Sequence, residues 1–167
     1  MDAVKAWLKS ERIAWDCDFI GIAVNTAPPQ EAKEIRWLYT EGPKNNAHQK
    51  IRLRIGRGIA GIVWKTARPQ SEDHLQSQPE KLMEYPISRT EKLESALAVP
   101  VFAPVVETPL LRQDQTFIST QTEVIGVLMV GFRRSRKFNQ DEITKLTACG
   151  ADVAYLLQKE AEKDDRF

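Results

Sequence analysis

The most informative segment of the chain is RIGRGIAGIVWKTARPQ, residues 54–70. Gly56, Gly58 and Gly61 have the spacing G-x-G-x-x-G of a dinucleotide-binding loop, which follows a buried parallel strand. The preceding residues IRLRI, 51–55, alternate apolar side chains with arginines. This alternation predicts a strand with one exposed face, whereas a strand covered by helices on both sides is apolar throughout. The pattern therefore argues against NAD or FAD binding.

Two other interpretations of the glycines remain open. In the first, they are structural: Gly56 and Gly58 allow a left-handed turn from strand to helix, and Gly61 allows close packing. In the second, the helix start also binds a small anion, because the amides of residues 58–61 lack intrahelical acceptors and the helix dipole is positive there. The apolar neighbours Ile59 and Ala60 would suit a weakly hydrated ion better than a phosphate ester.

Composition restricts the function classes. The 167 residues, 42% of them hydrophobic, suit one domain, and the net charge of +1 provides no global field for nucleic acid. The basic cluster at 133–137 is expected to be a solvated turn. The first residues do not read as a signal peptide, and no apolar stretch has membrane-spanning length, so we expect a cytoplasmic protein that does not enter a membrane.

The cysteines and histidines suggest no catalytic or metal centre. Cys17 and Cys149 lie far apart in the sequence and are expected to be free thiols in a reducing compartment. His48 and His74 lie in polar stretches, where a solvated imidazole is the usual case. No spacing of these side chains matches a zinc site, and we expect no metal, no cofactor and no catalytic residues.

Periodicity and turn residues predict an α+β fold with a mainly antiparallel sheet. A first helix should end before Asp16, and a second should start at the glycines and stop near Pro69. Residues 71–93 should be loop with a helical turn at 80–83, and Ala103–Thr122 is a long connection between strands. Strands are expected at the following ranges: 17–24, 34–39, 51–55, 95–102 and 123–132.

The last helix has the clearest start signal. Asn139 can cap it, and Glu142 stands where it completes a capping box, with Phe138 and Ile143 forming a hydrophobic staple. An apolar stripe then continues at helical spacing to Leu157. The tail at 161–167 is expected to fray.

With these segments in place, the chain resembles a GAF domain, a small-molecule-binding relative of PAS domains. The resemblance rests on the glycine segment, LAVPVF at 97–102, VIGVLMVGF at 124–132 and FNQDEITKL at 138–146, in that order. It implies one GAF domain over residues 1–167. It also implies about six antiparallel strands, with the first and last helices on one face and a ligand pocket on the other. The Ala103–Thr122 connection is longer than the family's tight hairpin.

Within this superfamily the chain is most similar to stand-alone NreA-type nitrate receptors, which serve two-component systems. Matching features are IRW at 35–37, GRGIAG at 56–61 and YPI at 85–87. The resemblance implies nitrate as ligand and a sensor histidine kinase as partner. The ligand-binding positions that it implies are Trp37, Gly58, Ile59, Ala60, Tyr85, Pro86 and Ile87.

Other roles for the aromatic residues and for the domain remain open. Trp37 and Tyr85 could each be an ordinary core aromatic residue. The domain could bind a cyclic nucleotide, or act as a homodimerisation module anchored by Trp7 or by the stripe ending at Leu157. Some GAF proteins reduce free methionine sulfoxide, which requires reactive cysteines at the pocket, but the two cysteines of this chain lie outside the pocket loops.

Overall fold

The structure is a computed structural model that describes residues 2–104 and 123–164. Its helices are α1 (Asp2–Trp15), α2 (Gly58–Thr66), α3 (Pro79–Glu84), α4 (Pro86–Glu91) and α5 (Gln140–Asp164). Its strands are β1 (Phe19–Asn25), β2 (Ile35–Glu41), β3 (Gln70–Glu72), β4 (Ser95–Phe102) and β5 (Val124–Phe132). Short 3-10 helices span Ala47–Lys50 and Leu75–Ser77.

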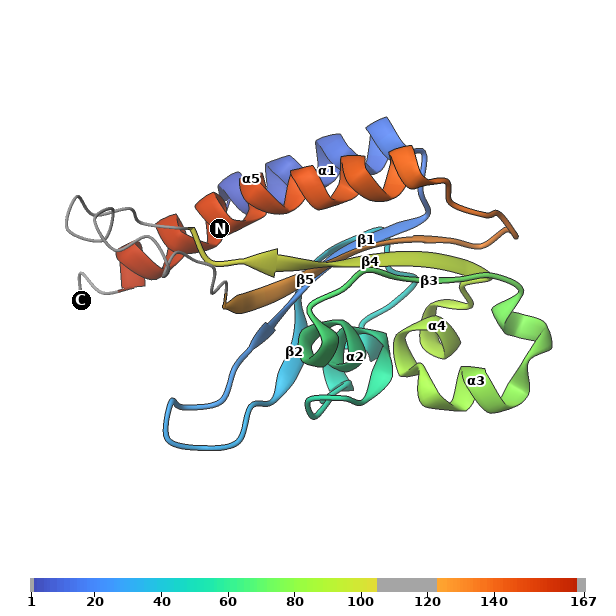
Figure 1. The fold of residues 1–167 in the computed structure, drawn as a ribbon, viewed down its shortest axis with the longest axis horizontal. Helices are drawn as coiled ribbons and strands as arrows, with labels where there is room; N and C mark the ends of the chain where they lie inside the picture. The colour runs from blue at the N-terminus through green and yellow to red at the C-terminus, as the bar shows by residue number, and fades with distance from the viewer. Residues whose placement is uncertain (1, 105–122, 165–167) are drawn as a thin grey trace, which may run out of the picture.

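The strands form one sheet in the order β2-β1-β5-β4-β3, and every neighbouring pair is antiparallel. Helices α1 and α5 lie side by side on one face, while α2, α3 and α4 lie on the other (Figure 1). The predicted α+β class and the pairing of the first and last helices are confirmed. The described residues contain five strands, close to the six expected.

Each central strand supplies two cores, because alternate side chains point to opposite faces of a sheet. In β4, Leu97 and Val99 pack with α1 and α5, whereas Ala96 and Ala98 face α2. The small side chains on the α2 face allow that helix to approach the sheet closely, and Val63 of α2 is fully buried there. Along β4, the larger side chains therefore face α1 and α5, and the alanines face α2 and the glycine turn.

Two local predictions were wrong. Residues 51–55 do not form a regular strand, and only one isolated bridge, Ile35 to Leu53, joins them to β2. The stretch expected to be loop contains the edge strand β3 and the helix α4. Helix α5 is described as far as Asp164, and the fraying of the tail at 161–167 stays a prediction. Most of the predicted long connection, residues 105–122, lies outside the described part of the chain.

The capping box of α5 is confirmed. The amide of Glu142 donates to Asn139 Oδ1 at 2.8 Å, and the amide of Asn139 donates to Glu142 Oε1 at 3.0 Å. Both members of the predicted staple, Phe138 and Ile143, pack against the core beneath α5. The sequence signal for this helix start therefore corresponds to real hydrogen bonds.

The basic cluster is not the simple solvated turn that was predicted. Arg133 donates from Nη2 to Glu91 Oε1 at 2.8 Å and from Nε to the Glu91 carbonyl at 2.9 Å. The Glu91 side chain is fully buried. Arg136 pairs with Glu142 and lies over the rings of Phe132 and Phe138. Arg133 thus connects the end of β5 to α4, whereas the side chain of Arg136 contacts residues within six positions of itself.

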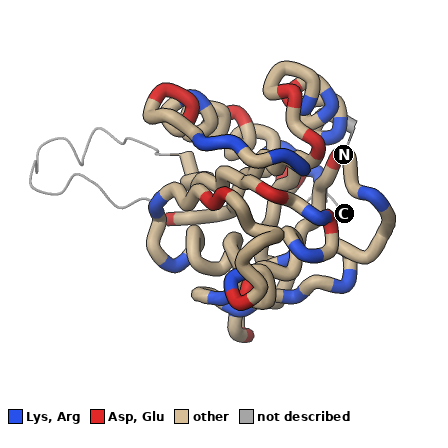
Figure 2. The backbone as a smooth tube through the Cα atoms, turned by 90° about the vertical axis from the view of Figure 1, so that its right-hand side faces the viewer, with Lys and Arg blue, Asp and Glu red and all other residues tan. Residues whose placement is uncertain are grey.

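Charges of both signs are interspersed along the backbone in the view of Figure 2, in keeping with the net charge of +1. No helix within residues 2–104 and 123–164 is long and apolar enough to cross a membrane.

We expect the Arg133–Glu91 ion pair to stabilise the fold. Replacing Arg133 with Met leaves the buried Glu91 carboxylate without its counter-charge, and breaking such a pair costs about 3 kcal/mol. The matched control is Arg134→Met, because Arg134 is 54% exposed and lies 3.8 Å from the exposed Asp16. We expect urea unfolding to show that this control lowers the free energy of unfolding by less than about 1 kcal/mol. Equal losses in the two variants would contradict the structural role of Arg133.

Candidate functional site

The start of α2 is formed by a compact turn. Gly56 and Gly58 have φ angles of 89° and 67°, so both take the left-handed conformation that glycine adopts without strain. The Gly56 amide donates to the Gly61 carbonyl at 2.8 Å. A Cβ on Gly61 would lie 2.5 Å from the Arg54 carbonyl oxygen, so the turn requires a glycine there too. The structural role predicted for the glycines is confirmed.

The same turn leaves main-chain donors unpaired. Arg57 at the N-cap is extended and its side chain makes no cap hydrogen bond. Within the described residues, no hydrogen bond joins the amides of Ile59 and Ala60 to an acceptor, as expected for the first residues of a helix. Both residues are fully buried, so these amides are not simply hydrated surface groups.

Trp37 lies on β2 and faces the same core as α2. Its ring meets the Phe19 ring edge to face at a centroid distance of 6.2 Å, and it packs over Gly21. The side chain is 3% exposed, and its Nε1 has no hydrogen-bond partner in the described structure. Trp15 has the same property, but it packs beneath α1 and α5 on the opposite face.

Tyr85, Pro86 and Ile87 form the junction between α3 and α4. Pro86 occupies the first turn of α4, where its missing amide is not needed. The Ile87 amide has no acceptor among the described residues, and its side chain is 1% exposed. The Tyr85 hydroxyl donates to Glu72 Oε2 at 3.1 Å, so it is already engaged within the protein.

The predicted site residues come together in two groups. The larger group shares one hydrophobic cluster: Trp37, Ile59, Ala60, Tyr85 and Ile87. Gly58 and Pro86 instead line a surface pocket of about 310 Å³ that reaches the start of α2. Leu53, Arg57 and Met83 complete much of its wall. The side chains of the larger group do not line this pocket, so it leads to the edge of the cluster rather than into it.

Sequence reasoning missed Glu72 and misjudged His48. Glu72 was expected in a polar loop, but it lies on β3 with only 6% exposure and accepts the Tyr85 hydroxyl. His48 was expected to be solvated, yet it is 5% exposed and bonded to Thr40 Oγ1 and the Asn45 carbonyl. Both stretches look polar in the sequence, and these two side chains become buried only when β3 pairs with β4 and residues 47–50 pack against α4.

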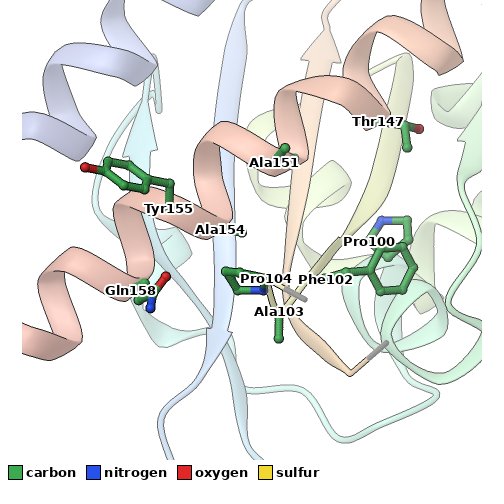
Figure 3. Close-up of a pocket in the computed structure, with 10 residues that line it drawn as sticks. Pro100, Phe102, Ala103, Pro104, Thr147, Ala151, Ala154, Tyr155 and Gln158 are labelled. Carbon is green, nitrogen blue, oxygen red and sulfur yellow. The ribbon is translucent and has the colours of Figure 1, made fainter. Parts of the chain in front are cut away.

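A second pocket, of about 370 Å³, lies on the opposite side of the molecule between β4 and α5 (Figure 3). Its walls include Pro100, Phe102, Ala151, Ala154 and Tyr155. The surface is mostly apolar and contains none of the predicted site residues. The described residues that line it include no Asp, Glu, His, Cys, Lys or Arg.

Neither cysteine lies on the α2 side of the sheet. Cys17 and Cys149 both pack with the core under α1 and α5. Burial raises the pKa of the Cys17 thiol to about 12, and burial together with the neighbouring Glu11 carboxylate raises the pKa of Cys149 to about 11. Both thiols are therefore protonated at neutral pH and are poor nucleophiles. The described residues also contain no group of three or more side chains that could hold a metal ion.

Comparison with known proteins gives structural relatives only, since no family model and no curated protein matches the sequence. An NreA protein from Staphylococcus aureus, mutated in its nitrate-binding site, is 30% identical with a TM-score of 0.66. The match covers 85% of this chain and 94% of that one.

Two more distant structures share the fold. One is the GAF domain of an Acinetobacter phosphoenolpyruvate-protein phosphotransferase, 14% identical with a TM-score of 0.69, where the match covers 98% and 85% of the two chains. The other is a free methionine-R-sulfoxide reductase from Neisseria meningitidis, 14% identical with a TM-score of 0.67. That match covers 96% of this chain and 78% of the reductase chain. The identity and coverage of the NreA match, with the shared fold of these structures, lead to one conclusion. The chain belongs to the GAF-domain family and, within it, to the NreA-like proteins.

Proposed function

We propose that the whole chain, residues 1–167, is one GAF domain that senses a small anion, nitrate, in the cytoplasm. The observation that carries the proposal is the buried Trp37 Nε1, which has no partner among the described residues. It belongs to the same cluster as Ile59, Ala60 and Ile87, whose amides also have no acceptor there. Donors without acceptors in an apolar environment favour a ligand that only accepts hydrogen bonds.

The energetics suit a compact, delocalised monoanion. Burying a charge is unfavourable unless hydrogen bonds and dipoles offset the lost hydration. Each hydrogen bond to a charged group contributes about 1.5 to 3 kcal/mol, and the start of α2 adds its dipole. Three or four such donors can offset the desolvation of a weakly hydrated ion. A phosphate ester carries more charge and would favour several arginines at the site, whereas Arg57 is the single arginine among the described residues that line the pocket at the start of α2.

Binding can be measured as a thermal shift with nitrate, nitrite, chloride and cyclic nucleotides. At a hundredfold excess over the Kd, a ligand adds about 2.7 kcal/mol of stability, or about 5 to 10 °C for a chain of this size. We expect this shift with nitrate and a smaller one with chloride. Trp37→Phe removes one donor and should weaken nitrate binding about tenfold.

The control is Trp15→Phe, because Trp15 also has a buried Nε1 without a partner but lies on the other face of the sheet. We expect its nitrate affinity to equal that of the wild type. The proposal fails if nitrate gives no shift, if chloride gives an equal one, or if the two tryptophan variants lose affinity equally. A shift with a cyclic nucleotide alone would favour that alternative ligand.

A free methionine sulfoxide reductase is the weaker alternative. That chemistry needs a thiolate at the pocket, and both thiols of this chain are buried on the other side of the sheet with raised pKa values. The proposed role is therefore binding without catalysis.

We also propose that occupancy is reported to a sensor histidine kinase, as the resemblance to NreA-type receptors implies. The purified kinase should show a different autophosphorylation rate with the nitrate-bound protein than with the nitrate-free protein. The same rate in both states, when the protein is present in excess, would refute a direct effect on kinase activity.

A homodimer through α1 and α5 is the proposed assembly. The expected anchors, Trp7 and Leu157, pack partly against the chain's own core. Ile13 on α1 and Tyr155 on α5 are instead 76% and 57% exposed. Light scattering should give twice the chain mass of 19.0 kDa, falling to the single mass in Ile13→Glu. A wild-type mass of one chain at micromolar concentration would contradict the dimer.

A further inference from the structure

Glu72 is a buried carboxylate next to the candidate anion site, and its role is unassigned. Its Oε2 accepts from the Tyr85 hydroxyl at 3.1 Å and from Gln70 Nε2 at 2.7 Å. Its Oε1 lies 2.8 Å from Lys81 Nζ. The Glu72 side chain is 4% exposed and that of Lys81 is 42% exposed. The carboxylate is thus enclosed by three donors, of which only Lys81 carries charge.

Tyr85 cannot serve Glu72 and an anion at the same time. A phenol has a single O–H to donate, and in this structure Glu72 receives it. Burial and the Glu72 charge also raise the pKa of Tyr85, so its hydroxyl keeps that proton over the physiological range. A hydrogen bond to a carboxylate is roughly twice as strong as one to a neutral acceptor, so the hydroxyl is firmly held.

We propose that Glu72 is an internal competitor that sets the affinity of the anion site. It acts in two ways: it occupies the Tyr85 hydroxyl, and it places a negative charge near the anion. This inference rests on the proposed function, since it assumes that an anion binds among Trp37, Tyr85 and the start of α2.

Lys81 reduces the effect of the Glu72 charge on the anion. By pairing with Glu72 it offsets part of the negative charge that the anion encounters. Removing Lys81 should therefore weaken anion binding, whereas neutralising Glu72 should strengthen it. A residue needed only for folding would not give opposite effects in two partners of one ion pair.

The test is calorimetric titration of the purified chain with nitrate. In Glu72→Gln the side chain keeps its shape but loses its charge, so Tyr85 is held by a weaker, neutral hydrogen bond. We expect the nitrate Kd to fall about tenfold. The Tyr85→Phe variant has no hydroxyl for Glu72 to occupy, so Glu72→Gln in that background removes only the Glu72 charge. It should then lower the nitrate Kd by less than about threefold. Lys81→Met should raise the Kd about threefold.

The matched control is Glu80→Gln. Glu80 is an exposed carboxylate on α3, next to Lys81 in the sequence, and it does not line the pocket at the start of α2. This control should change the Kd less than about threefold. Circular dichroism confirms that each variant is folded before titration.

The outcomes separate the two claims. Wild-type binding with an unchanged or higher Kd in folded Glu72→Gln overturns the competitor role and leaves the nitrate proposal intact. An equal gain in the Tyr85→Phe background shows that Glu72 does not act through the hydroxyl, which also overturns it. If Glu72→Gln does not fold, an unchanged or lower Kd in Lys81→Met overturns it instead. Failure of the wild type and every variant to bind nitrate overturns both proposals.

Discussion

The structure depends on how closely the chain approaches itself at the start of α2. The Gly56 amide bonds to the Gly61 carbonyl, and Gly61 lies where any side chain would meet the Arg54 carbonyl oxygen. This contact fixes the direction in which α2 leaves the turn, and hence the direction of its first amides. A side chain at position 61 would displace the helix from the sheet, and one at position 56 would be strained by the positive φ of the backbone.

The two faces of the sheet form different kinds of core. Leu97, Val99 and Leu128 provide a large-residue core beneath α1 and α5 that stabilises the fold. On the opposite face, Ala96 and Ala98 leave room for a helix start, three aromatic rings and a buried carboxylate. The carboxylate is accommodated there because Glu72 accepts hydrogen bonds from Tyr85 and Gln70 and pairs with Lys81. Such an arrangement suits a binding domain, in which the site must exchange partners without unfolding the whole.

Much of the fold could be predicted from local sequence signals. The capping box at Asn139 and Glu142 and the glycine turn each depend on residues within a few positions of one another, and both are confirmed. The strand β3 could not be found in this way, because QSE has no apolar alternation and becomes a strand only by pairing with β4. Glu72 was missed for the same reason. Its burial depends on Tyr85 and Lys81, which approach it only in the folded chain.

Prediction of the candidate site from the sequence has the same limit, because contacts between separate segments form only in the folded chain. Resemblance indicated which residues should gather, and five of them share one cluster. It gave no indication that the Tyr85 hydroxyl is engaged by a carboxylate, nor that the accessible pocket borders Gly58 and Pro86 rather than Trp37. Side-chain hydrogen bonds between distant segments depend on the exact approach of their backbones, which no short motif encodes.

In the proposed complex, unpaired N–H groups around the start of α2 hold the anion. A nitrate titration followed by ¹⁵N–¹H correlation NMR observes these groups directly. We expect saturable downfield shifts of the Ile59, Ala60 and Ile87 amides and of the Trp37 indole N–H, with the Trp15 indole unchanged. Shifts confined to surface residues, or to the α1 and α5 side of the sheet, would contradict it.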